Sequence, residues 1–164
     1  EMSVQGMNSL LKKLNNLSSN IDKAVEKAVK DAADKVAGDA KDLASADTGR
    51  LHNSIHVFMG DKDEYIYKDD KGKEYEGSLS GSTNTHTAVV GTNVEYAAYQ
   101  EFGTGQRGKA SDIEAKKEMD ISYKEDWAGM AAQPFMYPAM KQNEEYIKDT
   151  IKGAVRMEIK KVGK

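Results

Sequence analysis

A helical stripe near the N-terminus constrains the fold of this chain more than any other feature. Apolar residues recur there at steps of three and four positions, which places them on one face of an α-helix. They are Leu10, Leu14, Leu17, Ile21, Val25, Ala28, Ala32, Val36 and Ala40. On the opposite face, Glu26 with Lys30 and Asp31 with Lys35 are charge pairs at a spacing of four that support a solvated surface. The stripe predicts a long amphipathic helix that ends at about Leu43.

The length of this helix leaves two alternatives open. A continuous helix would be about 50 Å long, more than a domain of this size can cover. Ser18-Ser19-Asn20 could instead cap a second helix and break the first. We expect residues 21–44 to lie on the chain's own sheet. Residues 1–20 form an N-terminal helical extension that either stays with its own subunit or reaches a neighbouring one.

The middle of the chain has the alternation and the turn residues of short β-strands. The predicted strands run from Asn53 to Met59, Glu64 to Lys68, Gly72 to Glu76 and Thr85 to Val90, with a hairpin turn at Asp69-Asp70-Lys71 and a loop from Gly77 to Thr83. Helices follow from Glu95 to Phe102 and near the C-terminus, where Pro138 fits the first turn. Together these elements predict an α+β fold, an antiparallel β-sheet packed against a long N-terminal helix and a C-terminal helix.

Residues 103–132 lack a coherent apolar period and are dense in Gly, Lys, Asp and Glu. Ser111-Asp112-Ile113-Glu114 could open a short helix through a capping box. The remainder predicts a long loop inserted into a single α+β domain of residues 1–164. We expect this loop to be flexible in the free subunit, because its composition cannot form a core of its own.

Composition argues against several classes of function. The chain has 164 residues, a formal net charge of −3 with both signs interspersed, and no cysteine. Disulfides, thiolate zinc sites and cysteine nucleophiles are therefore excluded, and the charge argues against nucleic-acid binding by a general basic field. No secretory signal follows Met2, and no run of about 18 apolar residues is present, so we expect no membrane partner.

No residue pattern indicates catalysis or a metal site. On a strand, His52 and His56 would lie about 13 Å apart, too far to share one ion, and Glu64 would join them only by an accident of folding. Most carboxylates lie in mixed-charge runs such as Asp61-Lys62-Asp63-Glu64, which are typical of solvated loops. We therefore expect a protein that is not an enzyme and that uses no cofactor or metal.

The one motif that favours an enzyme runs from Gly103 to Lys109 and has the G-x-x-x-x-G-K spacing of a phosphate-binding loop. Ala110 stands where a magnesium-binding Ser or Thr is required, and the preceding segment is predicted to be a helix rather than a buried strand. A flexible basic loop is the better interpretation, with a nucleotide-binding enzyme as the alternative.

Aromatic residues cluster around the most strongly patterned segments of the chain. They are Tyr96, Tyr99, Phe102, Trp127, Phe135 and Tyr137. We expect Phe102 and Phe135 to pack in the core. Tyr and Trp are also enriched at subunit interfaces, because they combine a large apolar body with a polar tip. Trp127, within the long loop, is the residue we most expect to anchor into a partner.

Three segments, in a fixed order, resemble one known family. They are Asp47-Thr48-Gly49-Arg50-Leu51-His52-Asn53-Ser54-Ile55, then Gly91-Thr92-Asn93-Val94-Glu95-Tyr96-Ala97-Ala98-Tyr99-Gln100-Glu101-Phe102-Gly103-Thr104-Gly105, then Gln133-Pro134-Phe135-Met136-Tyr137-Pro138-Ala139. The set is similar to the minor tail proteins of long-tailed double-stranded DNA bacteriophages and prophages, a group of tail-component, tail-completion and head–tail joining (neck) proteins. The resemblance covers about residues 40–155.

The resemblance implies a structural subunit that acts by assembly. Several copies would form a ring at the head-proximal end of the tail, expected to be hexameric on assembly, and would dock to neighbouring neck and tail proteins. DNA would only pass through the ring. The protein would reside in the tail or neck of the virion, after assembly in the host cytoplasm. A host-encoded adaptor of the same fold is the alternative outside phages.

The resemblance also implies a set of fold-motif and ring-contact residues. They are Asp47, Thr48, Gly49, Arg50, Leu51, Gly91, Tyr96, Tyr99, Glu101, Phe102, Gly103, Thr104, Trp127, Pro134, Phe135 and Pro138. Asp47 or Thr48 would cap the turn that Gly49 permits, and Arg50 would face a partner's carboxylate. Gly103 would let the chain leave the short helix in a left-handed conformation. The two prolines would fix the start of the last helix.

Overall fold

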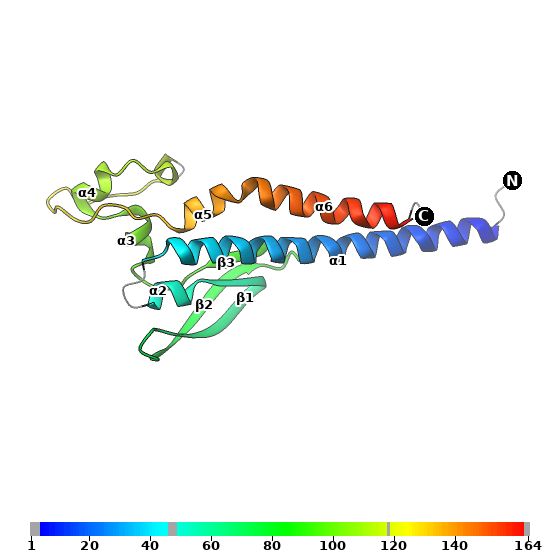
Figure 1. The fold of residues 1–164 in the computed structure, drawn as a ribbon, viewed down its shortest axis with the longest axis horizontal. Coiled ribbons are helices and arrows are strands. Elements are labelled where there is room, and N and C mark those ends of the chain that lie inside the picture. The colour runs from blue at the N-terminus through cyan, green and yellow to red at the C-terminus, as the bar shows by residue number, and fades with distance from the viewer. Residues whose placement is uncertain (1–3, 46–48, 118, 163–164) are drawn as a thin grey trace.

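The computed structural model describes residues 4–45, 49–117 and 119–162 (Figure 1). Its helical layer consists of α1 (Val4–Leu43), α5 (Met136–Gln142) and α6 (Glu144–Val162). Its sheet is antiparallel and contains β1 (His56–Lys68), β2 (Glu74–Ser82) and β3 (Ala88–Gly91) in the order β2-β1-β3. Short elements join these layers, namely α2 (Arg50–Ser54), α3 (Ala97–Phe102), α4 (Gly105–Ala110) and the 3₁₀ turn η1 (Glu114–Lys117). The predicted α+β class is confirmed.

The α1 helix is continuous across Ser18-Ser19-Asn20, so the alternative of a break there is wrong. Its 40 residues span about 60 Å. Figure 1 shows that α6 packs alongside α1 and that the N-terminal part of α1 extends past the end of α6. We call residues 7–20 of this part the arm. The predicted charge pairs shift by one turn, because Lys30 and Lys35 contact Asp34 and Asp39 at 2.8 and 2.5 Å.

The sheet is built around one long strand rather than two short ones. The first residues of β1 pair with β3, from His56 opposite Gly91 to Met59 opposite Ala88. The remainder of β1 pairs with β2, from Gly60 opposite Ser82 to Lys68 opposite Glu74. The predicted turn at Asp69-Asp70-Lys71 is confirmed, since Gly72 N donates to Asp69 O at 2.9 Å. The predicted loop from Gly77 to Thr83 is wrong, because β2 continues through Ser82.

The strand predicted to begin at Asn53 begins instead at His56, because residues 50–54 form α2. Gly49 precedes this helix with φ 67°, a conformation that glycine adopts without steric cost. A Cβ atom at this position would lie 2.0 Å from Asp70 Oδ1, so the turn also depends on the close approach of the hairpin. Asp47 and Thr48, the predicted caps of this turn, lie outside the described residues.

The core lies between α1, the sheet and the start of α5. Its members are alanines, branched aliphatic residues and aromatic residues, and they include Ala40, Leu51, Tyr67, Phe135 and Ala139. Ala40 and Ala139 are fully buried, so the alanine-rich stripe of α1 allows α5 to pack closely. Phe135 is buried as predicted, whereas Phe102 is only half-buried.

The predicted C-terminal helix is divided at Asn143, which lies between α5 and α6. Pro138 is the third residue of α5, in its first turn as predicted. The buried Asn143 side chain donates from Nδ2 to Asp39 Oδ2 at 2.6 Å and to Ala139 O at 2.8 Å. This contact with Asn143, together with Lys35, lowers the pKa of Asp39. The Asn143–Asp39 hydrogen bond thus holds the junction between α5 and α6 next to α1.

We predict that Leu51→Ala lowers the free energy of unfolding by about 2–5 kcal/mol, because Leu51 is 1% exposed and its truncation leaves a cavity in the core. Leu43→Ala is the matched control. Leu43 is 45% exposed, and we expect a change within about 0.5 kcal/mol. Urea unfolding followed by circular dichroism measures both. Equal losses for the two variants would contradict the placement of the core.

Candidate docking surfaces

A buried carboxylate joins α3 to α5 across the long loop. Glu101 is only 5% exposed, and its side chain accepts three backbone hydrogen bonds. Oε2 accepts from Phe135 N at 2.8 Å and Met136 N at 2.9 Å, and Oε1 accepts from Tyr137 N at 2.9 Å. Unpaired backbone N–H groups at a helix start are costly when they are buried, and an acceptor from elsewhere in the chain satisfies them here. Glu101 thus caps α5 from a position 34 residues earlier in the sequence.

The base of the long loop is closed by backbone hydrogen bonds. Gln133 N donates to Gln100 O at 2.8 Å, and Thr104 and Met130 exchange bonds of 2.8 and 3.0 Å between their backbone groups. Gly103 leaves α3 with φ 72° and ψ −177°, a positive-φ conformation that is extended in ψ rather than fully left-handed. A Cβ atom there would lie 2.6 Å from Met130 O, so glycine is required by the packing as well.

Residues 103–132 are therefore more ordered in the structure than a plain loop. They contain α4 and η1, and Ser111 Oγ bonds to Arg107 O and Ala132 N. The flexibility of this segment in the free subunit stays a prediction.

Within residues 103–109, backbone N–H groups that a phosphate-binding loop would need for its ligand are already hydrogen-bonded inside the chain. The backbone N–H groups of Gln106 and Arg107 donate to Trp127 O and Ala128 O, both at 2.9 Å. The Lys109 ammonium pairs with Glu125, and the element before Gly103 is the helix α3. A phosphate cradle requires inward-pointing free amides after a buried strand. The geometry therefore does not support nucleotide binding at Gly103 to Lys109.

Arg50 forms a two-pronged ion pair within its own chain. Its Nη1 and Nη2 atoms donate to Glu95 Oε1 and Oε2 at 2.8 and 2.9 Å. The guanidinium also lies 4.5 Å from the ring centroid of Tyr75. The hydrogen bonds that Arg50 donates to Glu95 lower the pKa of Glu95, and the same bonds raise the pKa of Arg50 above its usual value. The carboxylate that the sequence assigned to a partner subunit is supplied, in this structure, by the turn before α3.

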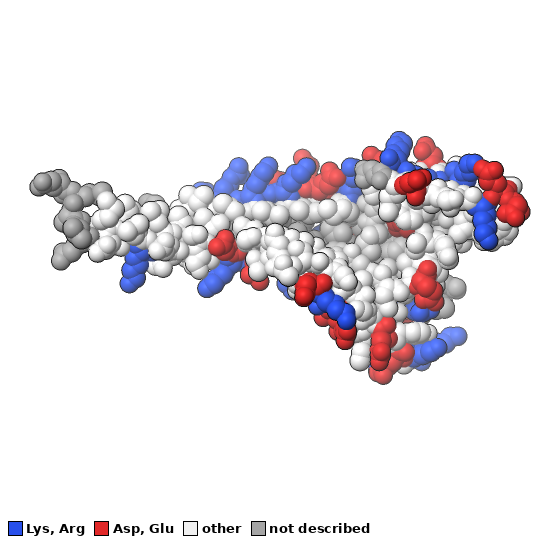
Figure 2. Space-filling model, turned by 180° about the vertical axis from the view of Figure 1, so that it is seen from behind, with Lys and Arg blue, Asp and Glu red and all other residues white. Residues whose placement is uncertain are grey.

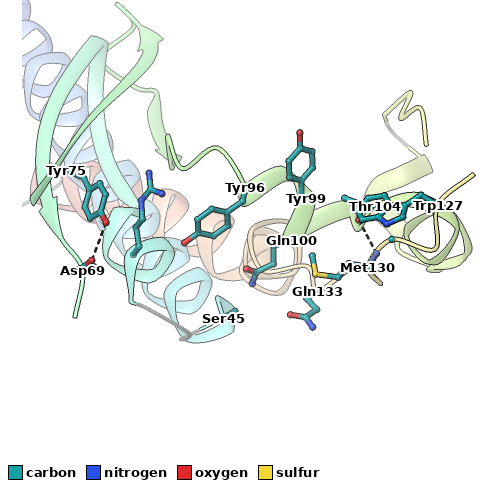
Figure 3. A pocket seen from close by; sticks show the side chains of 12 residues that line it. Ser45, Asp69, Tyr75, Tyr96, Tyr99, Gln100, Thr104, Trp127, Met130 and Gln133 are labelled. Carbon is teal, nitrogen blue, oxygen red and sulfur yellow. Dashed lines mark hydrogen bonds between the residues drawn. The ribbon is translucent and has the colours of Figure 1, made fainter. Parts of the chain in front are cut away.

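Five of the predicted residues line one open hollow of about 770 Å³ (Figure 3). They are Arg50, Tyr96, Tyr99, Thr104 and Trp127. In the figure the hairpin residues Asp69 and Tyr75 stand at one end and Trp127 at the other, with α3 between them. Tyr99 and Trp127 are largely exposed. The hollow joins the hairpin, α3 and the base of the loop into one surface rich in aromatic side chains.

A comparison with protein families decides which kind of protein this is. The sequence profile of the family described as "Bacteriophage HK97-gp10, putative tail-component" matches residues 8–103. The chain belongs to the HK97-gp10-like family. No curated protein and no solved structure matches the chain. The predicted relationship to phage tail proteins is confirmed, and the family assigns the chain a structural role in the tail, and hence in the virion.

The HK97-gp10-like segment runs from the arm to the end of α3. It contains the Arg50–Glu95 ion pair and the capping carboxylate Glu101. Trp127, Pro134, Phe135 and Pro138 lie beyond it, so the third motif of the resemblance is outside the matched residues.

The structure distributes the predicted residues over several places. Leu51 and Phe135 are in the core, and Gly91 ends β3 opposite His56. Glu101 and Gly103 hold the base of the loop, and Pro134 and Pro138 flank the start of α5. Arg50, Tyr96, Tyr99, Thr104 and Trp127 line the hollow. Gly49 and Phe102 do not line it.

Three residues with defined roles were missed by the sequence reasoning. Glu95 and Asn143 act through partners distant in the sequence, and no local pattern points to either contact. Gln100 is buried and lines the hollow, and its Nε2 atom has no hydrogen-bond partner among the described residues. The predicted aromatic face of α3 is its more exposed face, because Ala97, Gln100 and Glu101 are the buried residues.

The histidines lie apart and have partners of other kinds. His52 Nδ1 lies 3.0 Å from Lys41 O, and His56 Nε2 lies 2.8 Å from Asp63 Oδ2. Within the described ranges, no group of three His, Asp or Glu side chains is placed to hold a metal ion. None of the described helices combines the length and apolar character needed to cross a membrane.

We predict that Glu101→Gln lowers the free energy of unfolding by about 2 kcal/mol or more, because the amide nitrogen would face at least one buried backbone donor. Glu145→Gln, at an exposed position in the first turn of α6, is the control and should lower stability by less than about 1 kcal/mol, the contribution of a surface carboxylate near a helix N-terminus. Denaturant unfolding of both variants tests the role of the carboxylate. Equal stability of Glu101→Gln and the unsubstituted chain would show that the cap is not needed.

Proposed function

We propose that this protein completes the tail or joins it to the head by forming a ring and docking to neighbouring neck or tail proteins. The observation that carries the proposal is the family match over residues 8–103, because that family is described as a tail component. Sequence similarity assigns the class of protein, and the arrangement of surfaces in this chain supports the mode of action. Under this proposal the protein acts through contacts and not through catalysis.

Two groups of exposed apolar side chains lie at opposite ends of the molecule. One group is on the arm and comprises Met7, Leu10, Leu11 and Leu14. The other, which we call the loop surface, comprises Tyr99, Trp127 and Met130. Figure 1 places the arm and the loop region at opposite ends of an elongated subunit. Two separate surfaces allow one subunit to contact a second copy with one of them and a different protein with the other. Contacts between copies give a ring when the rotation between them closes.

The loop surface has the composition of a docking site for another protein. Aromatic and methionine side chains are enriched at the centres of interfaces, where they become desolvated on binding. Trp127 is 55% exposed and stands at the rim of the hollow that Figure 3 shows. We assign this surface to the neighbouring neck or tail protein. The net charge of −3 is suited to a ring, taken as hexameric, through which DNA passes without being gripped.

The proposal predicts the behaviour of the purified chain across a concentration series in light scattering, with and without purified tail tubes. We expect either a closed oligomer or a monomer that joins the tubes. Trp127→Ala should weaken tube binding by about tenfold or more, the usual effect of truncating an anchoring aromatic residue. Ile66→Ala is the control, since Ile66 is exposed on the sheet far from the loop in sequence.

A strict monomer that is indifferent to tail components would contradict the proposed function. Tube binding that Trp127→Ala and Ile66→Ala reduce equally would contradict the assignment of the loop surface.

A further inference from the structure

The apolar stripe that α1 buries in the body of the molecule continues into the arm, where Leu17 is half-buried and Leu10 and Leu14 are exposed. Leu10 and Leu14 lie about five helical turns before Ala28 and Ala32, so they share one side of the helix. Ala28 and Ala32 are buried under neighbouring elements. Leu14, by contrast, is 51% exposed, although leucine gains more than alanine from burial.

A groove with an apolar lining lies farther along the same stripe. It is lined by Ala32 and Ala33 of α1, which are buried and which we call its floor, and by Val90 of β3 and Met140 and Ile151 of the last two helices. This hollow has a volume of about 270 Å³. Small floor residues allow an incoming helix to approach closely, while only its apolar side chains enter.

The groove continues past Met136 and Met140 into a second hollow of about 390 Å³, which is also lined by Phe102 and Met119. Figure 2 shows a broad area free of Lys, Arg, Asp and Glu between the charged edge of the helices and the charged edge of the sheet. The two hollows therefore form one long apolar surface, which suits an apolar helix.

We propose that this groove receives the arm of a second copy of the chain. The exposed arm residues Met7, Leu10, Leu11 and Leu14 have the spacing i, i+3, i+4 and i+7 of anchors that dock a helix into an apolar groove. The inference deepens the proposed function, and rests on it, by naming the subunit contact of the ring.

The arm cannot fill the groove of its own chain. It is the straight continuation of the helix that forms the groove floor, and it points away from the body in Figure 1. A continuous α-helix would have to break to fold back on itself. The occupant therefore comes from another copy.

Charge supports the same pairing. The arm contains Lys12 and Lys13 and no acidic residue. The segment beside the second hollow carries the exposed acidic residues Asp112, Glu114 and Asp120 against one exposed lysine, Lys117, so its exposed charge is mainly negative. Opposite charges at the rim of an interface guide the approach of two surfaces and fix their direction. The arm of one copy would thus enter with its lysines toward the acidic segment of the next.

Disulfide crosslinking tests the contact directly, because these 164 residues contain no cysteine. One preparation carries only Leu14→Cys and the other only Met140→Cys, and the two are mixed and oxidised. We expect mixed crosslinked dimers in clear excess over crosslinked pairs of either single variant. The control replaces Leu14→Cys with Leu43→Cys, an equally exposed leucine at the other end of α1, and should lose the mixed product.

A second measurement tests whether the arm is needed for assembly without introducing cysteines. Leu11→Glu combined with Leu14→Glu, both at exposed positions, should leave the unfolding midpoint unchanged and raise the concentration for half-assembly by about tenfold or more. Leu43→Glu should leave assembly unchanged.

Two outcomes would overturn the inference while leaving the proposed function intact. One is a predominance of Leu14→Cys pairs, which would show that arms contact each other. The other is assembly, with tube binding, that is insensitive to the two glutamates. An unsubstituted chain that neither self-associates nor joins tubes would instead refute the proposed function and the inference together.

Discussion

The carboxylate of Glu101 is the interaction on which the arrangement of this molecule depends. By accepting the N–H groups of residues 135–137, it fixes the start of α5 beside the end of α3. The neighbouring bond from Gln133 N to Gln100 O closes the base of the long loop at the same place. Once α5 is placed, Asn143 turns the chain into α6 and holds it against Asp39 of α1. A short polar contact thus determines how the helical layer and the loop lie relative to the sheet.

The parts of the fold that follow from local pattern were predictable. The helical stripe of α1, the turn at Asp69-Asp70-Lys71 and the short helix before Gly103 each have a signature within a few residues. The extent of β2 was not predictable, because Gly and Ser disfavour strands in isolation and only the pairing with β1 extends it through Ser82. Continuity of α1 likewise depends on the absence of a strong helix breaker, since Ser and Asn are only mildly unfavourable inside a helix.

The candidate surfaces were predictable in their residues but not in their contacts. The motifs pointed to Arg50, Tyr99, Thr104 and Trp127, and the structure brings these residues to one hollow. Arg50 pairs with Glu95, 45 positions away, and Glu101 accepts from Phe135, 34 positions away. The local spacing of residues does not predict contacts between such distant positions. The arm shows most clearly what the apolar pattern alone cannot predict. Its stripe is as regular as the stripe in the rest of α1, and only the structure shows which of these residues are buried and which are exposed.

The proposed separate surfaces for separate partners would account for the apolar area that this tail component exposes. The loop surface is assigned to a neighbouring tail or neck protein, and the arm and groove to a second copy. Electron cryomicroscopy of phage tails assembled with and without this chain tests that account most directly. It predicts a closed ring of copies at the head-proximal end of the tail, with each arm in the groove of the next copy, and unfinished tails without the chain. Complete, head-joined tails that lack the chain would contradict it.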